Sequence, residues 1–359
     1  GRPPPGGVVG FRTGLPAGGP GGGRGEALAV ELVRWGLGVA VRSVLLVGLL
    51  LGAFAYLMLL ERKVLGYFHR RVGPNRVGPW GLLQPVADGV KSILKEDIVP
   101  QEADRPVFLL APALSLFTAL AAYAVIPVGP ELALGPWRIP LSMADPGAGV
   151  LVLLAFTSLG VYGISLGGWA SQSKYALLGS LRSSAQLISY EIAMAMNLLS
   201  VLAVAGSVRL ADIVEAQRAL PFALVQPVGF LLYLVSATAE VNRVPFDLPE
   251  AETELVAGYH TEYSGIRMAM FVMAEYVNLI TQASLITLLY LGGWLGPGGA
   301  AGPLWFVGKV AAVLFVFIWV RATLPRLRYD QLMSLGWKVL LPASVAHLVV
   351  YAAWVALRG

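Results

Sequence analysis

The chain has 359 residues, of which 57% are hydrophobic and 13% are charged, and its net charge at pH 7 is +5. Soluble domains are about 25% charged, so this composition excludes an ordinary soluble domain and indicates an integral membrane protein. The sequence has no cysteine, which excludes an iron–sulfur cluster or a thiolate metal site within it. Its three histidines lie far apart without a zinc-binding spacing, so we expect no metal site.

The first predicted element is a tail. Residues 1–25 are rich in Gly and Pro, a composition typical of disordered segments. They lack an adequate apolar core for a signal peptide. We therefore divide the chain into a disordered tail, residues 1–35, and a membrane domain, residues 36–359.

Long apolar stretches recur along the rest of the chain and predict eight membrane-spanning helices. They cover about residues 39–60, 107–128, 149–169, 185–205, 222–240, 268–291, 304–324 and 339–357. Between the first two spans, residues 64–71 and 82–95 each place apolar side chains on one helical face, which predicts short interfacial amphipathic helices. The expected fold class is therefore an all-α polytopic membrane protein.

Positive charge is unevenly distributed among the loops. Loops after odd-numbered spans hold sixteen Lys and Arg residues, whereas loops after even-numbered spans hold four. The positive-inside rule then predicts that the odd-numbered loops, including loops 61–106 and 241–267, are cytoplasmic.

Acidic residues concentrate in the segment EVNRVPFDLPEAETELVAGYHTEY, which follows the fifth span. This segment holds one arginine and six of the chain's 21 acids: Glu240, Asp247, Glu250, Glu252, Glu254 and Glu262. Carboxylates at a membrane edge usually belong to proton or ion paths. Helix capping is the alternative for Asp247 and Glu250, which have capping-box spacing, but it does not require the other acids.

Two further glutamates lie inside predicted spans, Glu191 in the fourth and Glu275 in the sixth. An ionised carboxylate at mid-span costs roughly 2.5–3.5 kcal/mol by insertion scales, so it must be neutral, paired or hydrated. A series of such groups can pass protons. The alternative is that each is merely satisfied by a neighbour, with Arg182 or Lys174 as the candidates for Glu191.

Two other features also have two interpretations, and a third, a basic cluster, has one. His260 can donate a proton to a substrate or bond within its loop. The pair Glu61 and Arg62, at the end of the first span, can border a mouth for a lipid-soluble substrate or reach the interface as a simple ion pair. The basic cluster at residues 70–76 can bind lipid headgroups.

Four long blocks of sequence resemble a known family. They are residues 61–91, 168–191 (GWASQSKYALLGSLRSSAQLISYE), 240–265 and 321–338 (RATLPRLRYDQLMSLGWK). They are similar to the H subunit of the proton-pumping NADH:quinone oxidoreductase, respiratory complex I, which is the bacterial counterpart of mitochondrial NADH dehydrogenase subunit 1. The similarity runs from about residue 36 to the end.

The resemblance implies a subunit that anchors the membrane arm of the complex to its peripheral arm. A quinone, ubiquinone or menaquinone, would enter from the bilayer between the first span, the amphipathic helix and the sixth span. The subunit would couple quinone reduction to proton translocation without independent catalysis, and without flavin, iron–sulfur centre or metal in this chain.

The implied partners are the peripheral-arm quinone-site and iron–sulfur subunits, the small membrane subunits, the antiporter-like subunits and the lipid bilayer, but no nucleic acid. The implied location is the bacterial cytoplasmic (inner) membrane.

The resemblance also assigns roles to individual residues. The expected quinone-binding residues are Glu61, Arg62, Phe68, Arg243, Phe246 and Asp247. The expected proton path consists of Glu191, Glu240, Glu250, Glu252, Glu254, Glu262 and Glu275.

The sequence departs from the family pattern in the third span. Many members carry a glutamate in a pattern like SELAVYGI, whereas this chain reads TSLGVYGI with Ser158 at that place. A serine can order water but cannot hold a proton as a carboxyl group does.

Two alternatives to the complex I subunit stay open from the sequence. One is the homologous membrane subunit of a membrane-bound hydrogenase or a deazaflavin-dependent dehydrogenase. The other is a stand-alone ion transporter.

Overall fold

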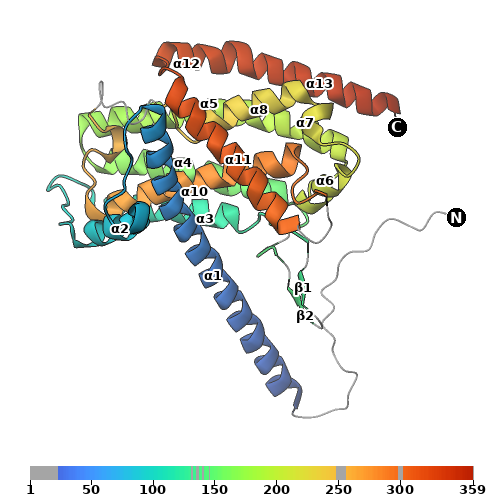
Figure 1. Cartoon of the computed structure of the whole chain (residues 1–359), viewed down its shortest axis with the longest axis horizontal. Helices are drawn as coiled ribbons and strands as arrows, with labels where there is room; N and C mark the ends of the chain where they lie inside the picture. Colours follow the sequence, from blue (N-terminus) through green and yellow to red (C-terminus); the bar gives the residue numbers. More distant parts are fainter. Residues whose placement is uncertain are drawn as a thin grey trace. The chain divides into compact units, whose positions relative to one another are not determined.

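The computed structural model describes residues 23–130, 132–134, 137–139, 141–144, 146–247, 256–297 and 302–358. Within these ranges the regular secondary structure is helical apart from one antiparallel hairpin of β1 (Leu132–Leu134) and β2 (Trp137–Ile139). Seven of the described helices are long and apolar enough to cross a membrane (Figure 1). The predicted all-α polytopic class is therefore confirmed.

The chain divides into two compact units, residues 1–44 and residues 45–359. In the first unit, α1 (Gly23–Phe68) begins at Gly23, so residues 23–35 are helical where the sequence predicts a flexible tail. Residues 26–35 contain neither Gly nor Pro and are rich in Ala, Leu and Glu, which favour helix. Residues 1–22 lie outside the described part of the chain.

Residues 45–68, the second half of α1, belong to the second unit. The helix continues without interruption to Phe68, so the prediction of a separate amphipathic helix at residues 64–71 is wrong. The charged triplet at 61–63 ends the apolar run, but Glu, Arg and Lys are good helix formers and do not end the helix.

The second predicted amphipathic helix is confirmed as α2 (Gln84–Leu94), preceded by a single turn at Pro79–Gly81. None of its residues is buried. Val86, Val90 and Leu94 line one face and are exposed, as expected for a helix at a membrane interface.

The remaining helices form the bundle of the second unit. They are α3 (Arg105–Tyr123), α4 (Gly149–Ala170), α5 (Lys174–Ala205), α6 (Leu210–Ala216), α7 (Phe222–Val225), α8 (Pro227–Glu240), the turn η2 (Gly258–His260), α10 (Gly265–Tyr290), α11 (Gly302–Thr323), α12 (Tyr329–Leu335), the π-helical turn at Gly336–Leu340 and α13 (Leu341–Arg358). In this unit α3 packs against α4 and α10, and α5 packs against α4, α8 and α13 (Figure 1).

Small residues allow the central helices to approach closely, as is usual in membrane bundles. A Cβ atom added to Gly163 would collide with Ser115 of α3, and one added to Gly168 would collide with Ser180 of α5. These glycines therefore bring α4 against α3 and α5, and they bring the polar groups of the three helices together.

The predicted fifth span, residues 222–240, is a broken helix. It consists of α7 and α8, separated at Gln226. Pro227 has no N–H to continue the bonding of α7, but it suits the first position of a new helix. The break leaves α8 with 14 residues, shorter than the other spans.

Candidate functional site

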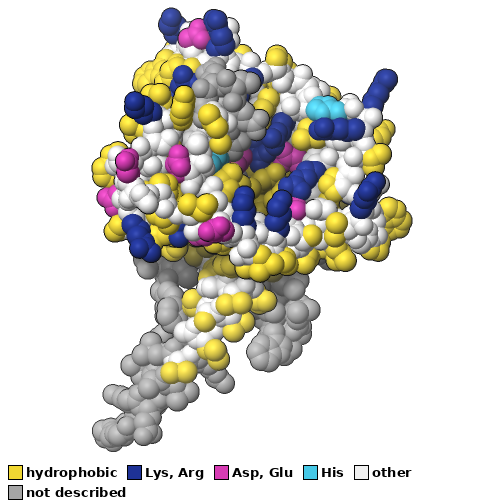
Figure 2. Space-filling view, turned by 90° about the vertical axis from the view of Figure 1, so that its left-hand side faces the viewer, with side chains coloured by type: hydrophobic (Ala, Val, Ile, Leu, Met, Phe, Trp, Pro, Cys, Tyr) yellow, Lys and Arg dark blue, Asp and Glu magenta, His cyan; other side chains and the backbone are white. Residues whose placement is uncertain are grey.

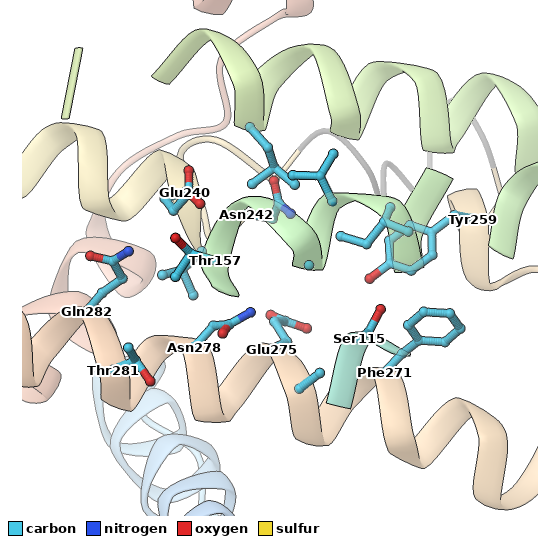
Figure 3. Close-up of a pocket in the computed structure, with 16 residues that line it drawn as sticks. Ser115, Thr157, Glu240, Asn242, Tyr259, Phe271, Glu275, Asn278, Thr281 and Gln282 are labelled. Carbon is cyan, nitrogen blue, oxygen red and sulfur yellow. The ribbon is translucent and has the colours of Figure 1, made fainter. Parts of the chain in front are cut away.

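The first candidate site is a small polar cavity among α3, α4, α8 and α10 (Figure 3). Its volume is about 50 Å³, and its polar lining includes Ser115, Thr157, Glu240, Asn242, Glu275, Asn278, Thr281 and Gln282. A buried water molecule needs roughly 10–15 Å³ of cavity volume. The cavity therefore has room for a few waters in contact with two carboxyl groups.

Glu240, the last residue of α8, lines this polar cavity together with Gln282 of α10 (Figure 3). Its Oε2 atom is buried and has no hydrogen-bond partner among the described residues. Glu191 on α5 is close enough to repel Glu240 electrostatically. Two acids that the sequence places in different spans are thus brought together.

Glu191 itself contacts Ser158 of α4, whose hydroxyl meets Glu191 Oε1. The same hydroxyl lies 2.9 Å from the backbone oxygen of Leu154. Arg182, one of the two bases considered as a partner for Glu191, lies over the ring of Tyr329, 5.8 Å from its centroid. The residue that departs from the family pattern is therefore a direct neighbour of the mid-span acid.

A buried ion-pair cluster adjoins the polar cavity and is centred on Arg243. The Arg243 guanidinium lies 2.9 Å from Glu61 Oε1 and 2.7 Å from Glu275 Oε1, and it lies over the ring of Tyr276 at 4.3 Å. Arg321 of α11 also pairs with Glu61. The cluster therefore joins the end of α1 to α10 and α11 through the loop after α8.

The charge of Arg243 is secured by its neighbours. Burial by itself lowers the pKa of Arg243. The carboxylates of Glu275 and Glu61 raise the pKa by more than burial lowers it, so the pKa lies above the ordinary arginine value. Only 7% of the residue is exposed. Removing either side of such a buried pair leaves an uncompensated charge in a poorly solvated place.

The second candidate site is a larger cavity of about 490 Å³ between α1, α2 and α10. Its apolar lining includes Phe54, Met58, Met268, Val272 and Met273. Its polar lining includes Arg62 and Asp88, which form a 2.7 Å ion pair, together with Lys91, Ser92, Lys95 and Ser264. The volume and the mainly apolar lining are those of a small-molecule site. We call it the α1–α2–α10 cavity.

Of the six predicted quinone-binding residues, only Arg62 lines that cavity; Glu61 and Arg243 belong to the ion-pair cluster, and the other three lie elsewhere. Phe246 is buried and packs against Tyr190, with ring centroids 5.6 Å apart. Asp247 pairs with Arg326, whose Nη2 lies 3.4 Å from Asp247 Oδ2. Phe68 lines a separate shallow hollow with Tyr67 and basic residues of the following turn.

The remaining predicted acids fall in different places. Glu262 is half-buried in the turn just before α10. Glu250, Glu252 and Glu254 lie outside the described residues, as does the capping box that Asp247 and Glu250 would form.

His260 lies in a buried environment among aromatic side chains. It is 3% exposed and its ring contacts the rings of Tyr259 and Phe271. Burial lowers its pKa to about 3, against the opposing effect of a hydrogen bond to the backbone of Ala257. The imidazole is therefore neutral at physiological pH, which favours packing over proton donation.

Sequence reasoning missed several residues of the two sites. Ser115 and Thr157 stand in apolar runs, and Ser115 lies against Gly163 of the neighbouring helix α4, a contact between distant segments that the local sequence does not show. Asp88 and Arg321 carry no signal, because their partners Arg62 and Glu61 are 26 and 260 positions away.

Basic side chains gather on the face of the second unit where the loops after α1, α4, α8 and α11 lie. Figure 2 shows Lys and Arg around a hollow on this face, with acidic side chains between them.

Within the described ranges, no group of three or more His, Asp or Glu side chains could hold a metal ion.

Comparison with known proteins agrees with this chemistry. The family described as NADH dehydrogenase matches residues 41–352. The H subunit of NADH-quinone oxidoreductase from Syntrophotalea carbinolica is 54% identical over 321 residues, which cover 89% of this chain and 97% of that protein.

An H subunit of the same enzyme from Syntrophobacter fumaroxidans is 51% identical over 333 residues, which cover 91% of this chain and all of that protein. The H subunit from Deinococcus deserti is 54% identical over 329 residues, or 88% and 83% of the two chains. The resemblance of the four sequence blocks is confirmed, and the chain belongs to the NADH dehydrogenase family, alongside the H subunits of NADH-quinone oxidoreductases.

Proposed function

We propose that this chain admits quinone through the α1–α2–α10 cavity and couples quinone reduction to proton movement through the polar cavity. The observation that carries the proposal is the position of the Arg243 cluster. Glu61 neighbours Arg62, which lines the α1–α2–α10 cavity, whereas Glu275 lines the polar cavity. Arg243 binds both glutamates.

Different side chains of α10 line the two cavities, which supports separate roles for the cavities. Met268, Val272 and Met273 line the α1–α2–α10 cavity, while Glu275, Asn278 and Gln282 line the polar cavity. A change of charge on one side of α10 therefore acts on the other side through one helix and one ion-pair cluster. Because the site is buried, such interactions are weakly screened.

The α1–α2–α10 cavity fits a quinone in size and polarity. An apolar lining accommodates the ring and the first isoprenoid carbons, and the Arg62–Asp88 pair and Ser264 supply hydrogen bonds. Reduction of a quinone to a quinol takes up two electrons and two protons. This chain has no cysteine for an iron–sulfur cluster, so we assign the electron supply to the peripheral-arm quinone-site and iron–sulfur subunits.

Ser158 has a defined part in this proposal. Its hydroxyl has one hydrogen but lies against two oxygens, Leu154 O and Glu191 Oε1. The single hydroxyl hydrogen can therefore be donated to either oxygen, and Ser158 is a hydrogen-bond donor toward Glu191 Oε1. Ser158 thus places a hydroxyl, where many family members have a second carboxyl group, directly against the mid-span acid.

We assign Glu262 and the acids at 250, 252 and 254 to the same proton path. The basic charge of loops 61–106 and 241–267 favours a cytoplasmic location for both loops. We assign the chain to a bacterial inner membrane, with these loops facing the peripheral arm. The small membrane and antiporter-like subunits would receive the protons. A stand-alone transporter and a hydrogenase subunit are not favoured, because the relatives are subunits of NADH-quinone oxidoreductases.

Glu240→Gln in the assembled complex tests the proposal. The amide cannot carry a proton, so protons translocated per NADH oxidised should fall strongly in closed vesicles. Glu215→Gln is the matched control, because Glu215 is a partly exposed surface acid paired with Arg218. Unchanged proton translocation in a normally assembled Glu240→Gln complex would refute the proposal.

A further inference from the structure

One face of α8 carries polar or small residues along its whole length. Gln226, Gly229, Tyr233, Ser236 and Glu240 follow one another at spacings of three and four, which places them on one helical face. Gln226, Tyr233 and Ser236 are completely buried. The 14 residues of α8 make this face roughly 20 Å long. We call it the α8 seam.

The end of the seam opposite Glu240 lies at the break between α7 and α8. Ser200 donates to Gln226 Oε1 at 3.1 Å, and Gln226 Nε2 donates to the Ser200 carbonyl at 3.3 Å. Asn197 donates to Ser344 Oγ at 2.8 Å. Together with His347 of α13, these residues form a polar group inside the bundle, which we call the break cluster.

The break cluster has buried polar atoms that lack a hydrogen-bond partner among the described residues. They are Asn197 Oδ1 and both ring nitrogens of His347. Asn197 is fully buried and His347 is 7% exposed. The His347 ring also lies directly against the seam, because a Cβ atom added to Gly229 would collide with that ring.

Buried polar atoms of this kind are normally satisfied by ordered water. A neutral imidazole offers one donor and one acceptor, and the Asn197 carbonyl offers an acceptor. The break cluster therefore has the groups to hold water. Interrupted membrane helices elsewhere mark the places where ions and protons bind.

Hydroxyl groups occupy the middle of the seam. The Tyr233 hydroxyl lies 3.5 Å from Gln282 Oε1, and Gln282 lines the polar cavity. The Tyr233 ring also contacts the Tyr290 ring at 5.5 Å. The Tyr290 hydroxyl is buried and has no hydrogen-bond partner within the described ranges. Groups that can exchange protons with water are thus present between the two ends.

We propose that the α8 seam is a second proton route, which connects Glu240 with water held at the break cluster, where His347 takes up and releases the proton. The inference rests on the proposed function, because it needs a proton-carrying Glu240. It adds a route along α8 toward the membrane face at the other end of the helix. The competing explanation is that the seam only packs helices together.

Two substitutions of His347 in the assembled complex distinguish the route from packing. His347→Phe removes the polar atoms, and His347→Gln keeps hydrogen bonding but cannot take up a proton at physiological pH. Both should lower the protons translocated per NADH in closed vesicles while assembly and quinone reduction by uncoupled vesicles persist. Tyr351→Phe is the control, because Tyr351 neighbours His347 but only donates to the Val225 carbonyl, at 2.6 Å; it should leave the ratio unchanged.

A wild-type ratio in His347→Gln would overturn the inference. If His347→Phe does not assemble, His347→Gln decides alone. Glu240→Gln is measured in parallel. Lost translocation in Glu240→Gln with normal translocation in His347→Gln removes only the second route, whereas normal translocation in Glu240→Gln removes the proposed function itself.

Discussion

The two cavities beside α10 differ in size and in the charged groups that line them, although one helix lines both. The α1–α2–α10 cavity is about 490 Å³ and is lined by the Arg62–Asp88 pair and two lysines, whereas the polar cavity is about 50 Å³ and is lined by the carboxyl groups of Glu240 and Glu275. The first has the size of a ligand site and the second that of a water chain. Under the proposed function the larger cavity takes quinone and the smaller one holds water and passes protons, and the ion pairs of Arg243 with Glu61 and Glu275 join the two.

The largest effect is expected from Arg243→Met, which removes the link itself. Glu61 loses one of its two arginine partners, and Glu275 loses its ion pair with Arg243. Breaking a buried pair costs roughly 3–5 kcal/mol. We expect little assembled complex on native gels. Arg218→Met, which removes an exposed ion pair, should assemble normally; equal assembly of the two variants would contradict a structural link at Arg243.

The next largest effects should distinguish the roles of the two cavities. Ala269→Phe adds a ring to the α1–α2–α10 cavity and leaves the polar cavity untouched. We expect a higher KM for quinone and an unchanged number of protons per NADH. Asn278→Leu replaces one polar group of the polar cavity with an apolar one and should give the opposite result, with an ordinary KM and a lower ratio. If both variants change the same parameter, the cavities do not have separate roles.

A smaller effect is expected from Ser158→Ala. It removes the hydroxyl beside Glu191, and a net hydrogen bond contributes about 1 kcal/mol. Proton translocation should slow moderately, and Ser158→Thr, which keeps the hydroxyl, should restore it. The rate of NADH-driven acidification in vesicles measures this, and equal rates for Ala and Thr would show that the hydroxyl has no part.

The smallest effect on turnover is expected from Asp247→Ala. Its side chain pairs with Arg326 outside both cavities, and a partly exposed pair is worth up to about 1 kcal/mol. The yield of assembled complex should fall, whereas turnover per assembled complex should not. Normal yield with lost turnover would instead place Asp247 in the reaction path.

Much of the fold follows from local sequence pattern. Apolar runs locate the spans, and the periodicity of residues 82–95 locates α2. Two local rules failed. The charged triplet at 61–63 does not end α1, and Pro227 divides a continuous apolar run, because proline is as suitable for starting a helix as for breaking one.

The candidate site was predictable as a set of acids but not as an arrangement. Costly carboxylates identify Glu191, Glu240 and Glu275 without any structure. Their partners come from distant segments, as when Arg243 reaches Glu61 across 182 positions. Spacing rules for helices cover only three or four residues and cannot find such pairs.

The most direct test of the link between the two cavities is the ratio of protons translocated to NADH oxidised in vesicles containing the assembled Glu275→Gln complex. Glu275 both lines the polar cavity and pairs with Arg243. The link predicts a lower ratio while electrons still reach quinone. A wild-type ratio at normal assembly and normal quinone reduction would contradict it.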